Sequence, residues 1–168
     1  MAPTTPTPYI DSTYQISRSL RFNSADSAYL NRTPASATNQ KTWTWSAWVK
    51  RGTISSLQTL FGTWSANTDA AAFAIYFSGS DTLSVLPWTN AIFTSTAVFR
   101  DPSSHYHLTL VYDSANATQA DRIIIYINGV RLSTSTASCP LNQATSFNSN
   151  TTVGYIGRNY GFNANSTD

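Results

Sequence analysis

Glutamate is absent from this sequence, and lysine occurs only as Lys41 and Lys50. Helices in soluble proteins rely on glutamate, lysine, alanine and leucine, so this shortage, beside abundant Ser, Thr and Asn, favours strands and loops. The ten Lys and Arg residues and the eight Asp residues are scattered singly, which leaves a net charge of +2 and no basic stripe. Because nucleic acid binding depends on such a stripe, we expect no nucleic acid partner.

The sequence also lacks a second cysteine and a long apolar run. Cys139 alone cannot form an intrachain disulfide, and its position next to Pro140 predicts a bystander in a loop. The longest apolar run, residues 70–77, is far shorter than the about 18 residues that suggest a membrane span, so we expect no membrane insertion. The amino terminus has neither the basic nor the apolar region of a signal peptide. A chain of 168 residues suffices for one domain with a core.

Apolar and polar residues alternate in many short stretches, which is the pattern of half-buried strands. In the stretch 41–51, this alternation predicts that Trp43 and Trp45 belong to the core, while Trp48 falls on the polar face and indicates a second covered surface. About ten strands at regular spacing predict an antiparallel sandwich or barrel. The predicted strands are 17–22, 27–31, 41–51, 58–64, 72–78, 82–88, 91–99, 106–112, 122–127 and 151–158, with a long loop at 134–150.

A tight hairpin is predicted at Asn128-Gly129, which stands between two apolar runs. Asn-Gly supplies the two positive φ angles of a type I′ turn, the strongest short-range hairpin signal. Such a turn pairs Ile127 with Val130 and Ile125 with Leu132. All four side chains then share one face, which we expect to lie in the core.

Three segments resemble one family, the concanavalin A-like, laminin-G-like jelly rolls. Trp43–Lys50 (WTWSAWVK) looks like a typical strand of that family, and Tyr106–Asp113 with Ile123–Val130 is similar to its strand, loop and hairpin. Val153–Asn159 (VGYIGRN) resembles its closing turn. The resemblance covers about residues 17–160 and implies an all-β jelly-roll sandwich of two antiparallel sheets. We expect this domain to occupy residues 16–168, after an extended polar arm at 1–15.

The resemblance has two further implications. The stretch RSLRFNSADSAYLNRTPA followed by KTWTWSAWVKRG is similar to laminin-G-like modules of bacteriophage tail fibres and virion surface proteins. The family usually continues past its closing turn into one more strand, and this sequence reaches Asp168 without it. Because a bare sheet edge invites aggregation, we expect either a fragment of a longer protein or an edge completed by a neighbour.

Hydrolysis is the activity that this family resemblance raises first. A glycosidase needs two carboxyl groups flanking the scissile bond, one of them held protonated. In the glucanases of this fold both are glutamates on one strand, whereas this sequence has no glutamate and no Asp-x-Asp pair on a predicted strand. We therefore predict that the protein is not an enzyme.

Metal binding is supported only weakly. His105 and His107 lie on one side of a predicted strand, but no carboxylate or cysteine nearby completes a site. Laminin-G-like modules often bind calcium through loop oxygens at the rim of the sandwich. The candidates here are Asp69, Asp81 and Asp113, together with Asn159, and no ligand spacing singles out a set. We expect no cofactor, with calcium as the open alternative.

The strongest functional signal is aromatic. Trp64 and Trp88 end predicted strands beside loops rich in Asn and Thr, and Arg158, Asn159 and Tyr160 follow the last strand. Aromatic faces stack on sugar rings while amide, carboxylate and guanidinium groups bond the hydroxyls, so these five residues are the predicted ligand-binding set. The alternative is that the aromatic residues cap the core.

Two functions remain open from the sequence. The first is a non-catalytic virion structural or surface module, in a phage tail fibre or associated with the capsid, that binds carbohydrate or another host-surface receptor. The second is a purely structural protein–protein assembly module without glycan affinity. In either case we expect localisation in the virion, contacts with other virion proteins and a homo-oligomer.

Overall fold

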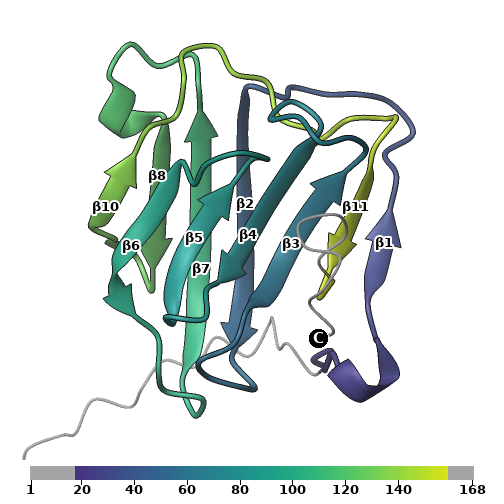
Figure 1. Cartoon of the computed structure of the whole chain (residues 1–168), viewed down its shortest axis with the longest axis vertical. Coiled ribbons are helices and arrows are strands. Elements are labelled where there is room, and N and C mark those ends of the chain that lie inside the picture. The colour runs from purple at the N-terminus through teal and green to yellow at the C-terminus, as the bar shows by residue number, and fades with distance from the viewer. Residues whose placement is uncertain (1–17, 159–168) are drawn as a thin grey trace, which may run out of the picture.

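The computed structural model describes residues 18–158, which form two antiparallel β-sheets packed face to face (Figure 1). These residues contain no α-helix, only two single-turn 3-10 helices, η1 at Ser24–Asp26 and η2 at Gln119–Asp121. The prediction of an all-β jelly-roll sandwich is confirmed. No helix within this range has the length and apolar character needed to cross a membrane. The predicted arm at 1–15 lies outside the described residues.

The larger sheet has seven strands in the order β1-β11-β3-β4-β5-β6-β10. Their bounds are Leu30–Arg32 (β1), Val153–Ile156 (β11), Gln58–Trp64 (β3), Ala72–Phe77 (β4), Thr82–Leu86 (β5), Phe93–Val98 (β6) and Thr134–Ala137 (β10). The smaller sheet has four strands in the order β2-β7-β8-β9. Their bounds are Thr42–Lys50 (β2), His105–Asp113 (β7), Ile123–Ile127 (β8) and Val130–Arg131 (β9).

Most predicted strands are present, and three stretches differ. The described part of the predicted strand 17–22 has no regular structure, since no described segment pairs with it, and 27–31 is reduced to the shorter β1. The predicted loop 134–150 begins with β10, which pairs with the edge of β6. The sequence of β10 does not alternate between apolar and polar residues, so it was not recognised as a strand. It is held by main-chain pairing with β6 and by the Thr134 hydroxyl, which accepts from the Thr94 N–H and donates to the Thr94 carbonyl.

The core fills the space between β4, β5 and β6 of the larger sheet and β2, β7 and β8 of the smaller one. Leu108, Leu110 and Tyr112 of β7 are fully buried, as their alternation predicted. Trp43 stacks on Tyr112 with ring centroids 5.0 Å apart and meets Phe73 edge to face at 5.2 Å. Burial of each such side chain contributes about 1.5–3 kcal/mol, so this aromatic cluster is a main source of the free energy of folding.

The predicted hairpin is present with the predicted register. Asn128 and Gly129 have φ angles of 51° and 81°, and Ile127 pairs with Val130. Ile125 is fully buried, whereas Val130 is 69 % exposed, so its assignment to the core was wrong. Val130 stands next to the turn in a two-residue edge strand, where no side chain of the larger sheet covers it.

Two other single residues lie in surroundings that the sequence did not indicate. Cys139 is in a loop, as predicted, but its side chain is fully buried in the core cluster, and its carbonyl accepts a hydrogen bond from the buried Arg122 guanidinium. Trp48 was expected under a second covering layer, but its side chain is 62 % exposed on the outer face of the four-stranded sheet. It contacts the His107 ring at 4.9 Å.

The larger sheet extends past the smaller one. β1 and β11 continue the seven-stranded sheet beyond the position where β2 ends the four-stranded sheet (Figure 1). We call β4, β5 and β6 with their cover the closed half and β1 with β11 the open half. Cross-strand pairing with Phe61 puts Ile156 and Leu30 on the inner face of the open half, where they are 39 % and 46 % exposed.

Candidate functional site

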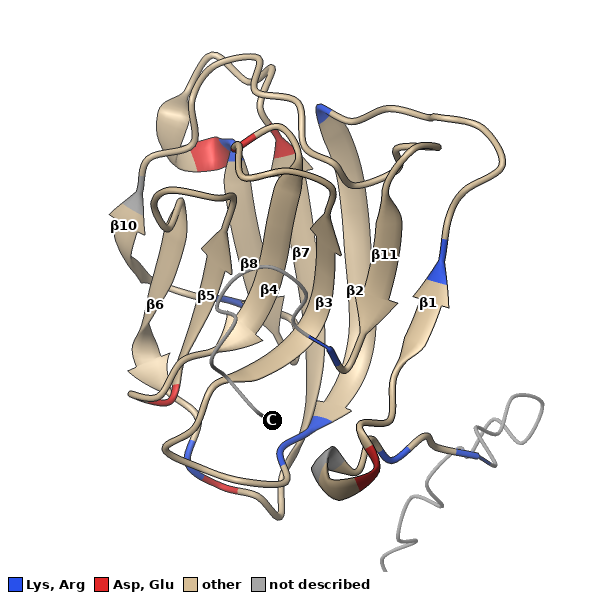
Figure 2. Ribbon diagram, turned by 45° about the vertical axis from the view of Figure 1, so that its right-hand side comes forward, with Lys and Arg blue, Asp and Glu red and all other residues tan. Residues whose placement is uncertain are grey.

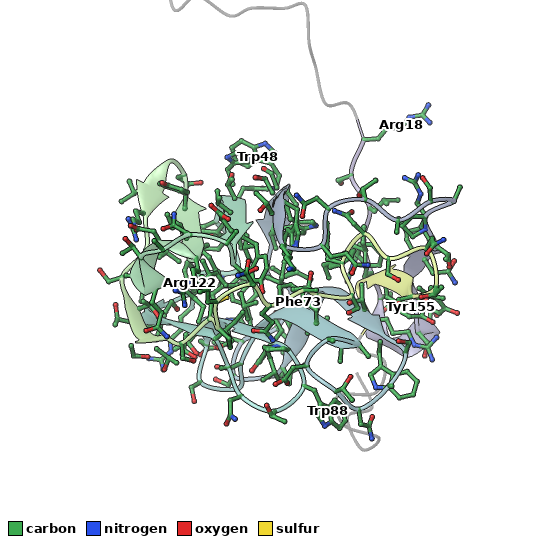
Figure 3. All side chains as sticks on the ribbon, turned by 90° about the horizontal axis from the view of Figure 1, so that it is seen from above. Arg18, Trp48, Phe73, Trp88, Arg122 and Tyr155 are labelled. Carbon is green, nitrogen blue, oxygen red and sulfur yellow. The ribbon has the colours of Figure 1, made fainter. Side chains whose placement is uncertain are left out.

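The outer face of the seven-stranded sheet carries two of the predicted tryptophans. Phe73, Ile75 and Phe77 of β4 point into the core, so Ala72 and Ala74 point to the opposite, outer face. Trp64 pairs with Ala72 and therefore shares that face. In Figure 3, Trp88 projects on this side of the sandwich and Trp48 on the other.

Small side chains occupy the middle of this outer face. Gly62 pairs with Ala74, and Ser84 pairs with Tyr76 on the adjacent strands. Ala72, Ala74 and Ser84 are almost fully buried, although they are not part of the core between the sheets. Burial and a hydrogen bond to Ser84 act on the Tyr76 phenol, and burial, the larger influence, raises its pKa. The face thus combines small residues with aromatic residues at its borders.

Two loops at one end of the sheet bring Trp64 and Trp88 into one polar environment. The Trp64 indole N–H donates to Asn67 Oδ1 at 3.1 Å in the β3–β4 loop. In the same loop, Asp69 Oδ1 accepts the main-chain N–H of Trp88 at 2.9 Å and of Thr89 at 2.8 Å in the β5–β6 loop. The carboxylate of Asp69 therefore joins the two loops and fixes the backbone that carries Trp88. We call these five residues the tryptophan rim.

Arg158 belongs to a different cluster on the same sheet. Its guanidinium carbon lies 4.5 Å from the ring centroid of Tyr29 and 5.8 Å from that of Tyr155. Tyr155 pairs with Gly62, and its neighbour Val153 pairs with Trp64, so Tyr155 is on the outer face near the rim. Cation–π contacts of this kind contribute about 0.5–1 kcal/mol at exposed sites. The other two predicted ligand-binding residues, Asn159 and Tyr160, lie outside the described residues.

The three calcium candidates do not come together. Asp69 is in the tryptophan rim, while Asp113 accepts hydrogen bonds from the Thr42 hydroxyl and the Ala115 N–H. Asp81 lies at a third position, and Figure 2 shows acidic residues at both ends of the sandwich. Among residues 18–158, no three His, Cys or Asp side chains gather in a group that could hold a metal ion. Each carboxylate is engaged by local donors instead.

Asp81 is the most strongly hydrogen-bonded of these carboxylates. The Ser55 N–H, Arg51 and Arg100 all donate to it, with the Arg51 contact at 2.8 Å and the Arg100 contact at 3.0 Å. These donors, first the Ser55 N–H, lower the pKa of Asp81 from its ordinary value of 3.8 to about 2. Since two guanidinium groups already surround it, Asp81 acts as the centre of an ion-pair network that ties three loops together.

Sequence reasoning missed three residues near these sites. Tyr29 completes the Arg158 cluster, and Asn67 and Thr89 complete the tryptophan rim. For Asn67 and Thr89, the available signal in the sequence was their position in loops next to Trp64 and Trp88. For Tyr29 there was no such signal, because only the pairing of β1 with β11 brings it to Tyr155, with ring centroids 5.9 Å apart.

The fold agrees with a comparison of the chain with known families. A laminin G-like family model, described as concanavalin A-like lectin/glucanases superfamily, matches residues 22–168. The chain belongs to this family. Among curated proteins, none matches the chain at a significant level. The superfamily includes both lectins and glucanases, so membership is compatible with carbohydrate binding or with a structural role.

Proposed function

We propose that this protein is a non-catalytic carbohydrate-binding module of a virion surface. The observation that carries the proposal is the tryptophan rim, in which Asp69 joins the loops of Trp64 and Trp88. The module binds a host-surface glycan, in a phage tail fibre or on the capsid.

The rim has the chemical character that sugar recognition requires. An indole face stacks on the apolar face of a sugar ring, and the hydroxyls at the ring edge need donors and acceptors close by. Asn67, Thr89 and the remaining lone pairs of Asp69 supply these groups beside Trp64 and Trp88. The only ionisable group among them is one carboxylate, so a neutral sugar suits the rim better than an acidic one.

The proposal is non-catalytic because the sequence lacks the pair of glutamates that the glucanases of this fold use, and because two of its aspartates are unsuited to act as a general acid. The sequence contains no glutamate. A general acid in a glycosidase needs a raised pKa, whereas hydrogen bonds lower the pKa of Asp81 and Asp101 to about 2. For Asp101 the main donors are the hydroxyls of Ser103 and Ser104.

The virion setting rests on the resemblance of two stretches, RSLRFNSADSAYLNRTPA and KTWTWSAWVKRG, to modules of phage surface proteins. Other virion proteins and further copies of the chain are the partners that such a setting supplies. A purely structural assembly role is the second candidate, favoured by the exposed inner side chains Leu30 and Ile156 of the open half.

A glycan array tests the proposed function, with the folded protein applied in calcium and again in chelator. We expect binding to a neutral glycan and a loss of about five- to tenfold in affinity for Trp88→Ala, since stacking of this kind contributes on the order of 1–1.5 kcal/mol. Trp48→Ala is the matched control, because Trp48 is exposed on the opposite sheet.

Three outcomes decide between the candidates. Binding that survives Trp88→Ala and Trp64→Ala contradicts the rim as the site. Absence of any bound glycan from folded protein favours the assembly role. A loss of binding in chelator alone adds a calcium ion to the proposal.

A further inference from the structure

The turn between β8 and β9 carries the one Asn-Gly step in the sequence, Asn128-Gly129. A glycine after an asparagine has no Cβ atom, so nothing shields its main-chain nitrogen from the asparagine side chain. Both residues are exposed, and the space around Gly129 is open. The chemistry of this step therefore favours attack of the Gly129 nitrogen on the side-chain amide of Asn128.

The reaction that follows from such an attack is deamidation. The Gly129 nitrogen bonds to Cγ of Asn128 and gives up its proton, while the side-chain nitrogen gains a proton and leaves as ammonia. Water then opens the resulting succinimide ring. Cleavage of the newly formed bond gives aspartate, whereas cleavage of the original main-chain bond gives isoaspartate, in which the main chain is longer by one methylene group.

The folded hairpin holds the Asn128 side chain in a position that prevents this reaction. Asn128 Oδ1 accepts the main-chain N–H of His107 at 2.8 Å, and the Asn128 N–H donates to the His107 carbonyl at 2.8 Å. These two bonds continue the ladder between β7 and β8 by one pair beyond Leu108 and Ile127. While they last, the side-chain amide faces β7 and not the Gly129 nitrogen.

The main chain of the turn adds a second restraint. Asn128 and Gly129 have the positive φ angles of a type I′ turn, and Ile127 pairs with Val130 across it. The succinimide ring is nearly planar and includes the main-chain carbonyl carbon of Asn128, so its closure requires a rotation of the main chain at this residue. The hairpin must therefore open before the ring can form.

Few contacts oppose this opening. β9 has two residues and lies last in the order of the four-stranded sheet, where Val130 is 69 % exposed. Leu132, directly after β9, packs against the core, and its N–H donates to the Ile125 carbonyl at 2.8 Å. Arg131 bonds Asp121 of η2 at 2.9 Å. Short, exposed elements of this kind open at a low free energy.

From the exposed Asn-Gly step, its two bonds to β7 and the weak attachment of β9, we propose that Asn128 is a modification site whose deamidation is controlled by opening of the β8–β9 hairpin. Aspartate as the product preserves the hairpin, because Asp-Gly also suits a type I′ turn and the carboxylate still accepts the His107 N–H. Isoaspartate lengthens the main chain of the turn, so Ile127 no longer pairs with Val130 and β9 detaches.

The test is incubation of the whole chain in neutral buffer, followed by peptide mapping with mass spectrometry. A capped peptide of residues 126–131 supplies the reference rate, since a segment this short has no stable hairpin. We expect Asn128 to react at least about tenfold more slowly in the folded protein than in the peptide. The opening constant from hydrogen exchange of the Asn128 amide should equal the ratio of the two rates, because both processes need the same opening.

Two variants test whether the hairpin sets the rate. Leu132→Ala weakens the attachment of β9 to the core, so the rate at Asn128 should rise about fivefold or more. Arg131→Ala removes the exposed bond to Asp121 and should give a smaller rise of about two- to fivefold, measured against a peptide with the same change. If Leu132→Ala fails to fold, Arg131→Ala decides alone.

Ile156→Ala is the matched control. It also truncates a partly exposed aliphatic side chain, but in the open half of the other sheet, so the rate at Asn128 should stay within about twofold. The protein that carries isoaspartate, separated by chromatography, should lose hydrogen-exchange protection at the Leu132 amide.

Several results overturn the proposal. These are equal rates in the folded protein and the peptide, and a rate that neither Leu132→Ala nor Arg131→Ala changes. Deamidation faster than the measured opening allows would mean that rotation of the side chain alone suffices. Protection at the Leu132 amide that survives in the isoaspartate form would contradict detachment of β9. Glycan binding enters none of these measurements, so the proposal stands or fails separately from the proposed function.

Discussion

The closed and open halves of the seven-stranded sheet are made of similar strands and differ in what covers them. In the closed half, Phe73 and Leu83 are fully buried against the four-stranded sheet. In the open half, the equivalent inward side chains Leu30 and Ile156 keep 46 % and 39 % of their surface exposed. The comparison teaches that strand formation does not require a complete sandwich, since β11 is held by main-chain pairing with β1 and β3 while its inner face is partly uncovered.

The largest expected difference between the halves is in side-chain truncation. Phe73→Ala removes a fully buried ring that packs against Trp43 and Tyr112, so it should lower the free energy of unfolding by about 3–5 kcal/mol. Ile156→Ala should cost about 1 kcal/mol or less, because much of that side chain is already in water. Urea denaturation of both variants measures the two values, and equal losses would mean that the open half is covered in solution.

The second difference concerns ion pairs and depends on pH. The folded-state pKa of Asp81 is about 2 against an ordinary value of 3.8, so its stabilisation is present above pH 4 and lost as the pH falls toward 2. Asp81→Asn should lower the free energy of unfolding at pH 7 and flatten its decline in acid, while Asn still accepts the positive φ of 65°.

The exposed pair of Asp121 with Arg131, 2.9 Å apart, is the matched control for Asp81. Both of its side chains are about half exposed and screened by water, so Asp121→Asn should change the free energy of unfolding by about 0–1 kcal/mol. Thermal denaturation at several pH values measures both variants. An unchanged acid profile for Asp81→Asn would contradict its role in the loop network.

A smaller difference is expected between two glycines with positive φ. Gly129 has a φ of 81° with open space around it, so Gly129→Ala should cost about 1 kcal/mol from backbone strain alone. Gly157 has a φ of 78°, and a Cβ there would lie 2.5 Å from the Phe22 ring, so Gly157→Ala should cost more. Adding Phe22→Ala should remove the excess, and chemical denaturation of the three variants checks it.

The smallest effect is expected at Cys139. Its thiol is fully buried, and burial raises its pKa, so the reactive thiolate is scarce. A thiol reagent should leave the native protein unmodified and react only after denaturation, and oxidants should not shift the melting temperature. Rapid labelling of the native protein would show that the closed half opens readily near β10.

The predictability of the fold and of the site differed from element to element. The alternation in β2 and β7 and the Asn-Gly turn specified their strands and register, because period-2 patterns and positive φ angles are local properties. Val130 and Trp48 were misassigned because burial depends on what lies opposite, which no local pattern contains. Trp64 and Trp88 were predicted as ligand-binding residues because they end predicted strands. The connection of their loops through Asp69 was not predicted, since 19 residues separate Asp69 from Trp88.

The sequence by itself determined that this chain is built of strands, where most of them begin and end, and which family it belongs to. Only the tertiary structure decided that Asp69 joins two loops and Asp81 anchors an ion-pair network rather than both serving as calcium ligands in one set. The same holds for Cys139, which lies in the core, and for β2, which among residues 18–158 pairs with a strand on one side only. The reason is physical: hydrogen bonding along a strand follows from neighbouring residues, whereas burial, charge pairing and edge exposure follow from segments that meet only after folding.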